Sequence, residues 1–225
     1  MPDATAESWM LEGPFVGQPA PLPQRGSPSA IAKQQASAPV RLTGSGLDGD
    51  RQADPKVHGG SDRSICHYPG QHYPHWRALY PDCPVLALPA AFGENVGGDR
   101  GPDETEVCIG DVLRLGSAIV QVSQARAPCW KIEDRTAAPG LTRRVAESGR
   151  TGWLCRVLEA GEVPPHPTLT LLERPHPQWT VARAWSVFRG EAEPEARAEL
   201  GALEPLAAAW RAAIAQRLAY RRKGS

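Results

Sequence analysis

Short apolar runs separated by Gly, Pro and Asp recur along residues 17–173. Runs of about four to eight apolar and β-branched residues bounded by turn-forming residues are typical of β-strands. Many such strands followed by a few helices favour a β-barrel with a helical unit at its C-terminal end. The candidate strands are PSAIAKQ (28–34), PVRLTG (39–44), PVLALPAAF (84–92), DVLRLG (111–116), SAIVQVSQ (117–124), GWLCRVLEAG (152–161) and TLTLLER (168–174).

Residues 111–124 carry the clearest pattern. Leu113 and Leu115 precede a Gly-Ser turn, and Ile119 and Val120 follow it, so the segment predicts a β-hairpin.

Two short helices are expected between the strands. One lies near QHYPHWRAL (71–79), although Pro74 weakens it. The other is PGLTRRVAES (139–148), which starts on a proline and ends before Gly149, as helices often do.

The composition changes at Thr180, after which Ala, Glu, Arg and Leu dominate. Thr180 is a residue type that caps helix N-termini. We expect three helices here, over 180–188, 193–203 and 205–222, and the last has one apolar face. That face comprises Leu206, Trp210, Ala213, Ile214 and Leu218.

Charge and hydropathy exclude several classes of protein. Lys plus Arg and Asp plus Glu number 25 each, so the formal net charge is +0. The chain therefore has no excess positive charge to attract nucleic acid or an anionic membrane. No run approaches the roughly 18 apolar residues of a membrane span, and no secretory signal is visible. The basic run at 217–223 makes DNA binding an alternative, but the neutral net charge argues against it.

The five cysteines are widely spaced and form no CxxC pair. This pattern supports neither a zinc ribbon nor a disulfide framework. We therefore expect reduced thiols and a cytoplasmic protein.

The stretch DPKVHGGSDRSICHY (54–68) joins cationic side chains to a Gly-Gly pair. Lys56, His58 and Arg63 surround Gly59 and Gly60, and bare backbone N–H groups beside cations make an anion site. A tight turn with solvated charges is the alternative.

Cys129 lies where the strand pattern of residues 117–124 has ended, after a proline and between Arg126 and Lys131. A flanking guanidinium favours the thiolate, which is both a nucleophile and a ligand for soft or high-valent metals. A buried, inert cysteine is the alternative. Among the tryptophans, Trp130 is the one expected near a pocket, whereas those of the helical tail are expected in its core.

A second cluster, CHYPGQHYPH (66–75), contains one cysteine and three histidines. Zinc is a weak alternative here, because Pro69 and Pro74 break the helical spacing that would put two histidines on one face. Histidines packed against aromatic rings are the preferred interpretation.

Seven short motifs occur in order along the chain. They are PSAIAK (28–33), GLDGDRQADPKVHGG (46–60), HYP (67–69), FGEN (92–95), GD (110–111), QVSQARAPCWK (121–131) and GW (152–153). Together they resemble MOSC-domain proteins, and among these the bacterial YiiM-like branch of hydroxylaminopurine-resistance proteins. The resemblance extends from about residue 16 to the end.

The resemblance implies a mostly β fold with α elements. It implies a closed MOSC-type β-barrel over 16–175 and a three-helix unit over 178–222, and we expect residues 1–15, before the resemblance begins, to form a flexible leader. It also implies a molybdenum-dependent oxidoreductase that binds molybdopterin and reduces N-hydroxylated bases and related compounds from N–OH to N–H. Electrons would come from a separate flavin reductase. As the charge and hydropathy indicate, no nucleic-acid or membrane partner is expected, and a homodimer is not excluded.

The resemblance also suggests roles for single residues. Cys129 is expected to ligate molybdenum and, with His58, to be catalytic. The groups expected to bind the cofactor are Lys56, His58, Gly59, Gly60, Arg63 and Arg126 at its phosphate, and Asn95 and Ser123 at the pterin edge. The alternative function is a carrier of sulfur or of the molybdenum cofactor that uses a persulfide on Cys129.

Overall fold

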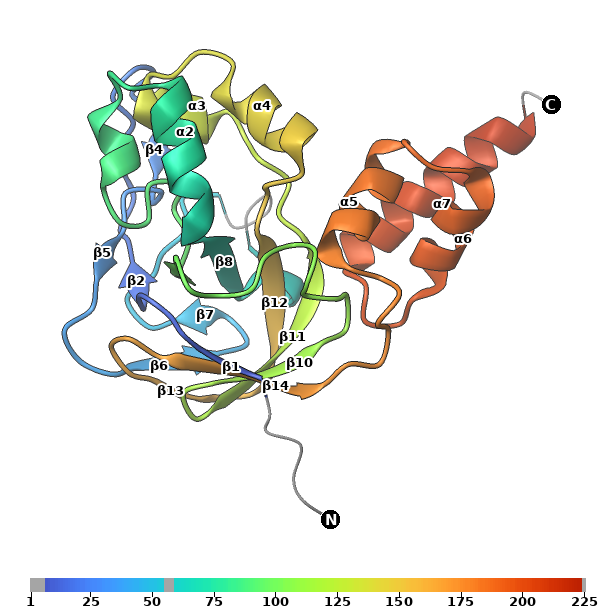
Figure 1. The fold of residues 1–225 in the computed structure, drawn as a ribbon, viewed down its shortest axis with the longest axis horizontal. Helices are drawn as coiled ribbons and strands as arrows, with labels where there is room; N and C mark the ends of the chain where they lie inside the picture. Colours follow the sequence, from blue (N-terminus) through green and yellow to red (C-terminus); the bar gives the residue numbers. More distant parts are fainter. Residues whose placement is uncertain (1–6, 55–58, 224–225) are drawn as a thin grey trace.

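The computed structural model describes residues 7–54 and 59–223. A strongly curved β-sheet forms the larger body, short helices cover one end of it, and a helical unit lies to its side (Figure 1). In the described residues, no helix is long and apolar enough to cross a membrane.

The main sheet has seven strands in the order β1-β14-β10-β11-β12-β8-β9. Its two edges meet, because Glu12, just after β1, exchanges backbone hydrogen bonds of 2.7 and 3.1 Å with Gly97 of β9. A sheet joined edge to edge is a barrel, so the predicted fold class is confirmed. The strands are β1 (Ser8–Met10), β8 (Ile65–Pro69), β9 (Val96–Gly98), β10 (Val112–Leu115), β11 (Ala118–Ala125), β12 (Trp153–Glu159) and β14 (Thr168–Glu173).

Three smaller sheets accompany the main sheet. Their order is β13-β6-β7, β2-β5 and β3-β4. The strands are β2 (Phe15–Val16), β3 (Ala20–Pro21), β4 (Pro28–Ser29), β5 (Gln34–Gln35), β6 (Val40–Thr43), β7 (Gly46–Leu47) and β13 (Gly161–Val163).

The predicted hairpin is present as β10 and β11. Leu113 and Leu115 of β10 and Val120 of β11 are at most 1% exposed and fill the barrel. The turn needs Gly116, whose φ is +63°, because a Cβ there would lie 2.3 Å from the carbonyl oxygen of Glu162.

The run at 84–92 is not a strand, and that prediction was wrong. Residues Pro84–Ala87 form a 3-10 helix instead. Pro84 and Pro89 lack the N–H donors of a strand ladder, and Pro84 suits the first turn of a helix.

The segment expected as a flexible leader is tied to the barrel from Ser8 onward. Strand β1 pairs with β14, and Leu11 is only 1% exposed. Residues 1–6 lie outside the described part of the chain.

Three helices cover the end of the barrel near the candidate site (Figure 1). Helices α2 and α4 were predicted; α3 was not, although it begins only two residues after Cys129. Pro74 is compatible with α2 because it occupies the first turn. The helices are α2 (Tyr73–Leu79), α3 (Lys131–Thr136) and α4 (Leu141–Ser148).

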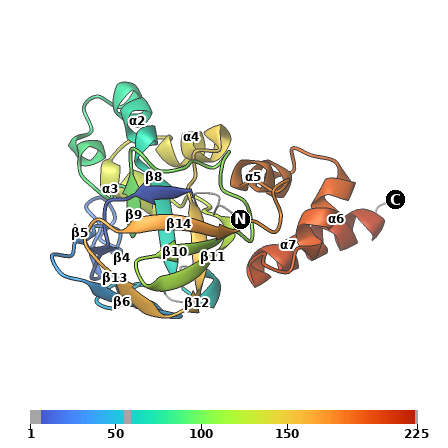
Figure 2. The ribbon, with the colours of Figure 1, turned by 60° about the horizontal axis from the view of Figure 1, so that its bottom comes forward.

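The C-terminal unit consists of α5 (Val181–Arg189), α6 (Pro194–Ala202) and α7 (Ala208–Lys223). The Thr180 side chain accepts a 3.1 Å hydrogen bond from Arg183 N–H, as the predicted N-cap should. Figure 2 shows the unit outside the barrel wall, yet its buried side chains, such as Trp185 and Ile214, belong to the same hydrophobic cluster as the barrel interior. The unit is therefore packed against the barrel.

Candidate functional site

A cavity of about 480 Å³ opens beside the end of β11. Its walls come from segments far apart in the sequence, namely residues 29–33, 50–53, 92–95 and 124–131, together with the C-terminal helices. Cavities of roughly this size, lined by apolar and a few convergent polar groups, are typical of cofactor and substrate sites.

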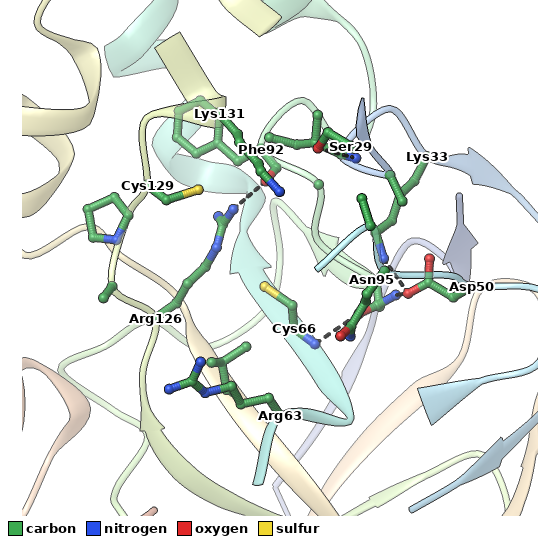
Figure 3. A pocket seen from close by; sticks show the side chains of 18 of the residues that line it. Ser29, Lys33, Asp50, Arg63, Cys66, Phe92, Asn95, Arg126, Cys129 and Lys131 are labelled. Carbon is green, nitrogen blue, oxygen red and sulfur yellow. Dashed lines mark hydrogen bonds and ion pairs between the residues drawn. The ribbon is translucent and has the colours of Figure 1, made fainter. Parts of the chain in front are cut away.

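Cys129 lies on this wall, partly exposed, with its sulfur directed into the cavity (Figure 3). Its backbone is fixed from two sides, because its carbonyl oxygen accepts hydrogen bonds from Ile132 N–H (3.1 Å) and Thr142 Oγ1 (3.2 Å). The loop from β11 into α3 therefore holds the thiol in place while leaving the sulfur open.

Arg126 extends along the same wall toward Cys129 (Figure 3). Its guanidinium donates to the carbonyl oxygen of Phe92. Burial lowers the pKa of Arg126, but the neighbouring Cys66, Cys129 and Glu94 raise it by more, so its net pKa is raised. The guanidinium thus carries a fixed positive charge beside two thiols.

Cys66 is the second thiol of the cavity, and the sequence did not single it out for this site. It lies on β8, and its N–H donates a 3.0 Å hydrogen bond to the Asn95 side-chain oxygen. Burial raises the pKa of Cys66, and the charge of Arg126 opposes this only in part. Cys66 therefore keeps its proton at neutral pH.

A buried polar row forms the opposite wall, and it was also missed. Lys33 Nζ makes an ion pair with Asp50, and the two side chains are only 9% and 8% exposed. Asp50 also accepts from Asn95 Nδ2 at 2.8 Å and from Gly17 N–H at 2.9 Å. The available signal was the position of Lys33 and Asp50 within two of the motifs that carry the family resemblance.

The structure brings four of the predicted site residues together at the cavity: Arg63, Asn95, Arg126 and Cys129. The Asn95 amide, expected at a pterin edge, is already engaged by the protein, since it also donates to Phe15 O at 3.1 Å.

Other predicted residues lie elsewhere. Ser123 is 0% exposed, and its hydroxyl lies 2.6 Å from Asp62 O and 2.9 Å from Leu154 O, away from the cavity surface. Gly59 and Gly60 are outside the described cavity lining. Lys56 and His58 fall in 55–58, which is outside the described residues, so their roles stay predictions.

The structure corrects the prediction for Trp130 and refines the one for the histidine cluster. Trp130 is 38% exposed beneath the Arg25 guanidinium and does not line the cavity, whereas Trp210 does. In the cysteine and histidine cluster, His67 stacks on Trp153 with ring centroids 4.0 Å apart. Within the described ranges, no group of three or more His, Cys, Asp or Glu side chains converges to hold a metal ion.

The cavity can therefore accept a ligand with negative charge. Five cationic side chains line it, and one of them, Lys33, is paired with the carboxylate of Asp50 in the same wall. Arg and Lys bind phosphate and other anionic oxygens, and a thiolate suits a soft metal that brings its remaining ligands with it. The cationic residues are Lys33, Arg51, Arg63, Arg126 and Lys131.

The chain is similar to a known sequence family and to known proteins. The MOSC domain, as a sequence family, matches residues 54–167, about half of the chain. Protein YiiM of Escherichia coli (strain K12) is 43% identical over 149 residues, which make up 66% of this chain and 66% of that protein. A protein named Reductase from Gibberella moniliformis is 41% identical over 162 residues, or 72% of this chain and 28% of that protein.

A solved structure has the same fold. The crystal structure of YiiM from Geobacillus stearothermophilus matches with a TM-score of 0.77 and 29% sequence identity, over 92% of this chain and 99% of that one. Against the curated relatives, the chain spans just under two thirds of the length of E. coli YiiM and little more than a quarter of the Gibberella protein.

Proposed function

The chain belongs to the MOSC-domain family, and from this premise we propose that it binds a molybdenum cofactor and reduces N-hydroxylated compounds. The observation that carries the proposal is the Cys129 thiol, which faces a cavity of about 480 Å³ beside the charged Arg126. A single protein thiolate at an open position leaves room for ligands from a cofactor and for a substrate oxygen.

The residues present fit an anionic, sulfur-ligated cofactor. Cys129 would supply the protein ligand of the metal, and Arg63, Arg126 and Lys131 would neutralise the cofactor's negative groups. When bound, the cofactor supplies the two-electron chemistry that breaks the N–O bond.

The chain's own residues would prepare that reaction. Conversion of N–OH to N–H consumes two electrons and two protons and releases water. Arg126 keeps its positive charge beside Cys129, whereas burial raises the pKa of Cys66, so that its Sγ retains its proton. The electrons would come from a separate flavin reductase, and the similarity to a protein named Reductase supports reductive chemistry.

The test uses protein from a host that makes molybdopterin. We expect molybdenum and pterin in near-equal amounts with wild type, and loss of both metal and N–OH reduction in Cys129→Ala. Cys83→Ala is the matched control, because Cys83 is also partly exposed but lies outside the described cavity lining. Retention of metal and activity in Cys129→Ala would rule out the proposal.

The alternative is a sulfur or cofactor carrier that holds a persulfide on Cys129. It draws on the same observation, because an open thiol beside a guanidinium also suits persulfide chemistry. Intact-protein mass spectrometry separates the two functions: a reducible mass increase of one sulfur on Cys129, in protein free of molybdenum, favours the carrier.

A further inference from the structure

We infer that the C-terminal helical unit is part of the substrate site and selects substrates by the aromatic group they carry. The inference rests on the proposed reduction of N-hydroxylated compounds and adds the part of the chain that discriminates among them. Phe188 of α5 and Ala209 and Trp210 of α7 line the same cavity as Cys129. We call these three residues the helical wall.

Ring contacts hold the helical wall in place. The rings of Phe188 and Trp210 are stacked, with centroids 3.8 Å apart and planes inclined by 12°. The Arg217 guanidinium also lies over the Phe188 ring, 4.7 Å from its centroid. A ring held by these two neighbours offers a fixed apolar surface, which suits shape selection better than a mobile side chain.

The unit is also fixed to the barrel close to the cavity. Ala207 N–H donates to Ser123 O at 2.9 Å, and Ala208 N–H, at the start of α7, donates to Asp62 Oδ2 at 2.8 Å. Asp62 directly precedes Arg63, which lines the cavity. On helix α5 of the unit, Trp185 Nε1 donates to Ala146 O of α4 at 2.8 Å. These bonds hold the helical wall at a set distance from the barrel wall.

The two sides of the cavity differ in chemistry, and this difference defines the ligand. The barrel side carries all the thiols and most of the polar groups alongside apolar residues such as Phe92 and Leu154, whereas the helical wall contributes only two aromatic rings and a methyl group. A molecule with its polar N–OH end near Cys129 would place its other substituent against an apolar surface. An aromatic substituent would gain the most binding free energy there, because it buries a large apolar area and packs edge-to-face with other rings.

The test compares two compounds that differ only in this substituent, phenyl in N-hydroxybenzamidine and methyl in N-hydroxyacetamidine. Their dissociation constants are measured by calorimetry with oxidised, cofactor-loaded protein and no electron donor, and their KM and kcat values are then measured with a reductant. We expect wild type to bind the phenyl compound more tightly. In Phe188→Leu its affinity should fall several-fold and its KM should rise, with kcat unchanged and with little effect on the methyl compound.

A second variant acts by adding bulk. Ala209 is exposed in the first turn of α7, so Ala209→Phe should fold and narrow the cavity. We expect the variant to weaken binding of the phenyl compound by on the order of tenfold and to weaken binding of the methyl compound much less. The matched controls are Ala215→Phe, at an exposed position of the same helix, and Tyr220→Leu, at a residue that is 81% exposed. Both residues lie outside the described lining of this cavity.

The outcomes separate this inference from the proposed function. Equal effects on both compounds, effects no larger than in the controls, or no binding of the phenyl compound to wild type would overturn the role of the helical wall. If neither compound is reduced, yet the wall variants selectively weaken binding of the phenyl compound, the proposed reaction fails and the helical wall stands.

Discussion

Different kinds of interaction stabilise the two sides of the cavity. The barrel side depends on charge: a buried ion pair between Lys33 and Asp50, and Arg126 set between two thiols and Glu94. The helical side depends on packed rings and on a few hydrogen bonds at the start of α7. Charged groups that have lost water tolerate few changes, whereas an apolar surface can vary in size at modest cost. Under the proposed function, the barrel side would hold a constant cofactor and the helical side a variable substrate.

The largest effect is expected at Arg126. Arg126→Met removes the charge beside Cys129 and leaves the Phe92 carbonyl oxygen without this donor. We expect bound molybdenum to fall by about 10–100-fold, the usual cost of losing a group that supports a metal ligand. Elemental analysis measures it, with Arg143→Met on the exposed face of α4 as the control. An unchanged metal content in Arg126→Met would mean that the barrel side does not depend on this charge.

The next effect concerns the Lys33–Asp50 pair. Asp50→Asn leaves the Lys33 ammonium buried without its counter-charge and should lower the free energy of unfolding by roughly 3–5 kcal/mol. Lys33→Met should cost less, because Asp50 would keep the N–H donors of Gly17 and Asn95. Chemical denaturation at neutral pH measures both. Equal losses for the two variants would contradict this account of the barrel side.

A third effect, in the barrel interior, depends on pH. His67 is buried and stacked on Trp153, and burial, helped by the charge of His72, lowers its pKa to about 3. Below its ordinary pKa of 6.5 the unfolded chain binds a proton that the folded chain refuses, so His67 makes stability fall as pH drops from 6.5 toward 3. His67→Phe should flatten the stability curve in that window; the same slope in both proteins would exclude His67 as its source.

The smallest effect is expected where the helical unit joins the barrel. Partial burial raises the pKa of Asp62, but the hydrogen bonds from Ala208 N–H and Arg156 outweigh it, so the net pKa lies below 3.8. Asp62 therefore stabilises the fold above its ordinary pKa, and this contribution is lost as pH falls through the lower folded value. Asp62→Asn should cost about 1 kcal/mol at pH 7. The cost should disappear in acid, and a cost that persists there would point to packing instead of charge.

Local patterns were enough to predict the elements that local forces decide. The hairpin of β10 and β11 followed from two apolar runs around Gly116, and the start of α5 followed from Thr180. The buried face of α7 followed from helical spacing, as the buried Trp210 and Ile214 show. These features depend on neighbours in the chain, which the sequence displays directly.

The composition of the site was harder to predict because it depends on distant contacts. Motif order identified Cys129 and Arg126, but Cys66 was assigned to a different cluster. Trp210 was assigned to the core alone, although it also faces the cavity. No spacing in the sequence indicates that β8, the loop after β11 and α7 meet around one hollow, because closure of the barrel and docking of the helices bring them together.

The central claim is that the Cys129 thiol holds the cofactor in this cavity. Its most direct test is alkylation by iodoacetamide followed by peptide mass spectrometry, on protein from cofactor-producing and cofactor-deficient hosts. The account predicts that Cys129 is modified only in the cofactor-free protein, while Cys83 reacts equally in both. Equal modification of Cys129 in the two preparations, with molybdenum present in one of them, would contradict it.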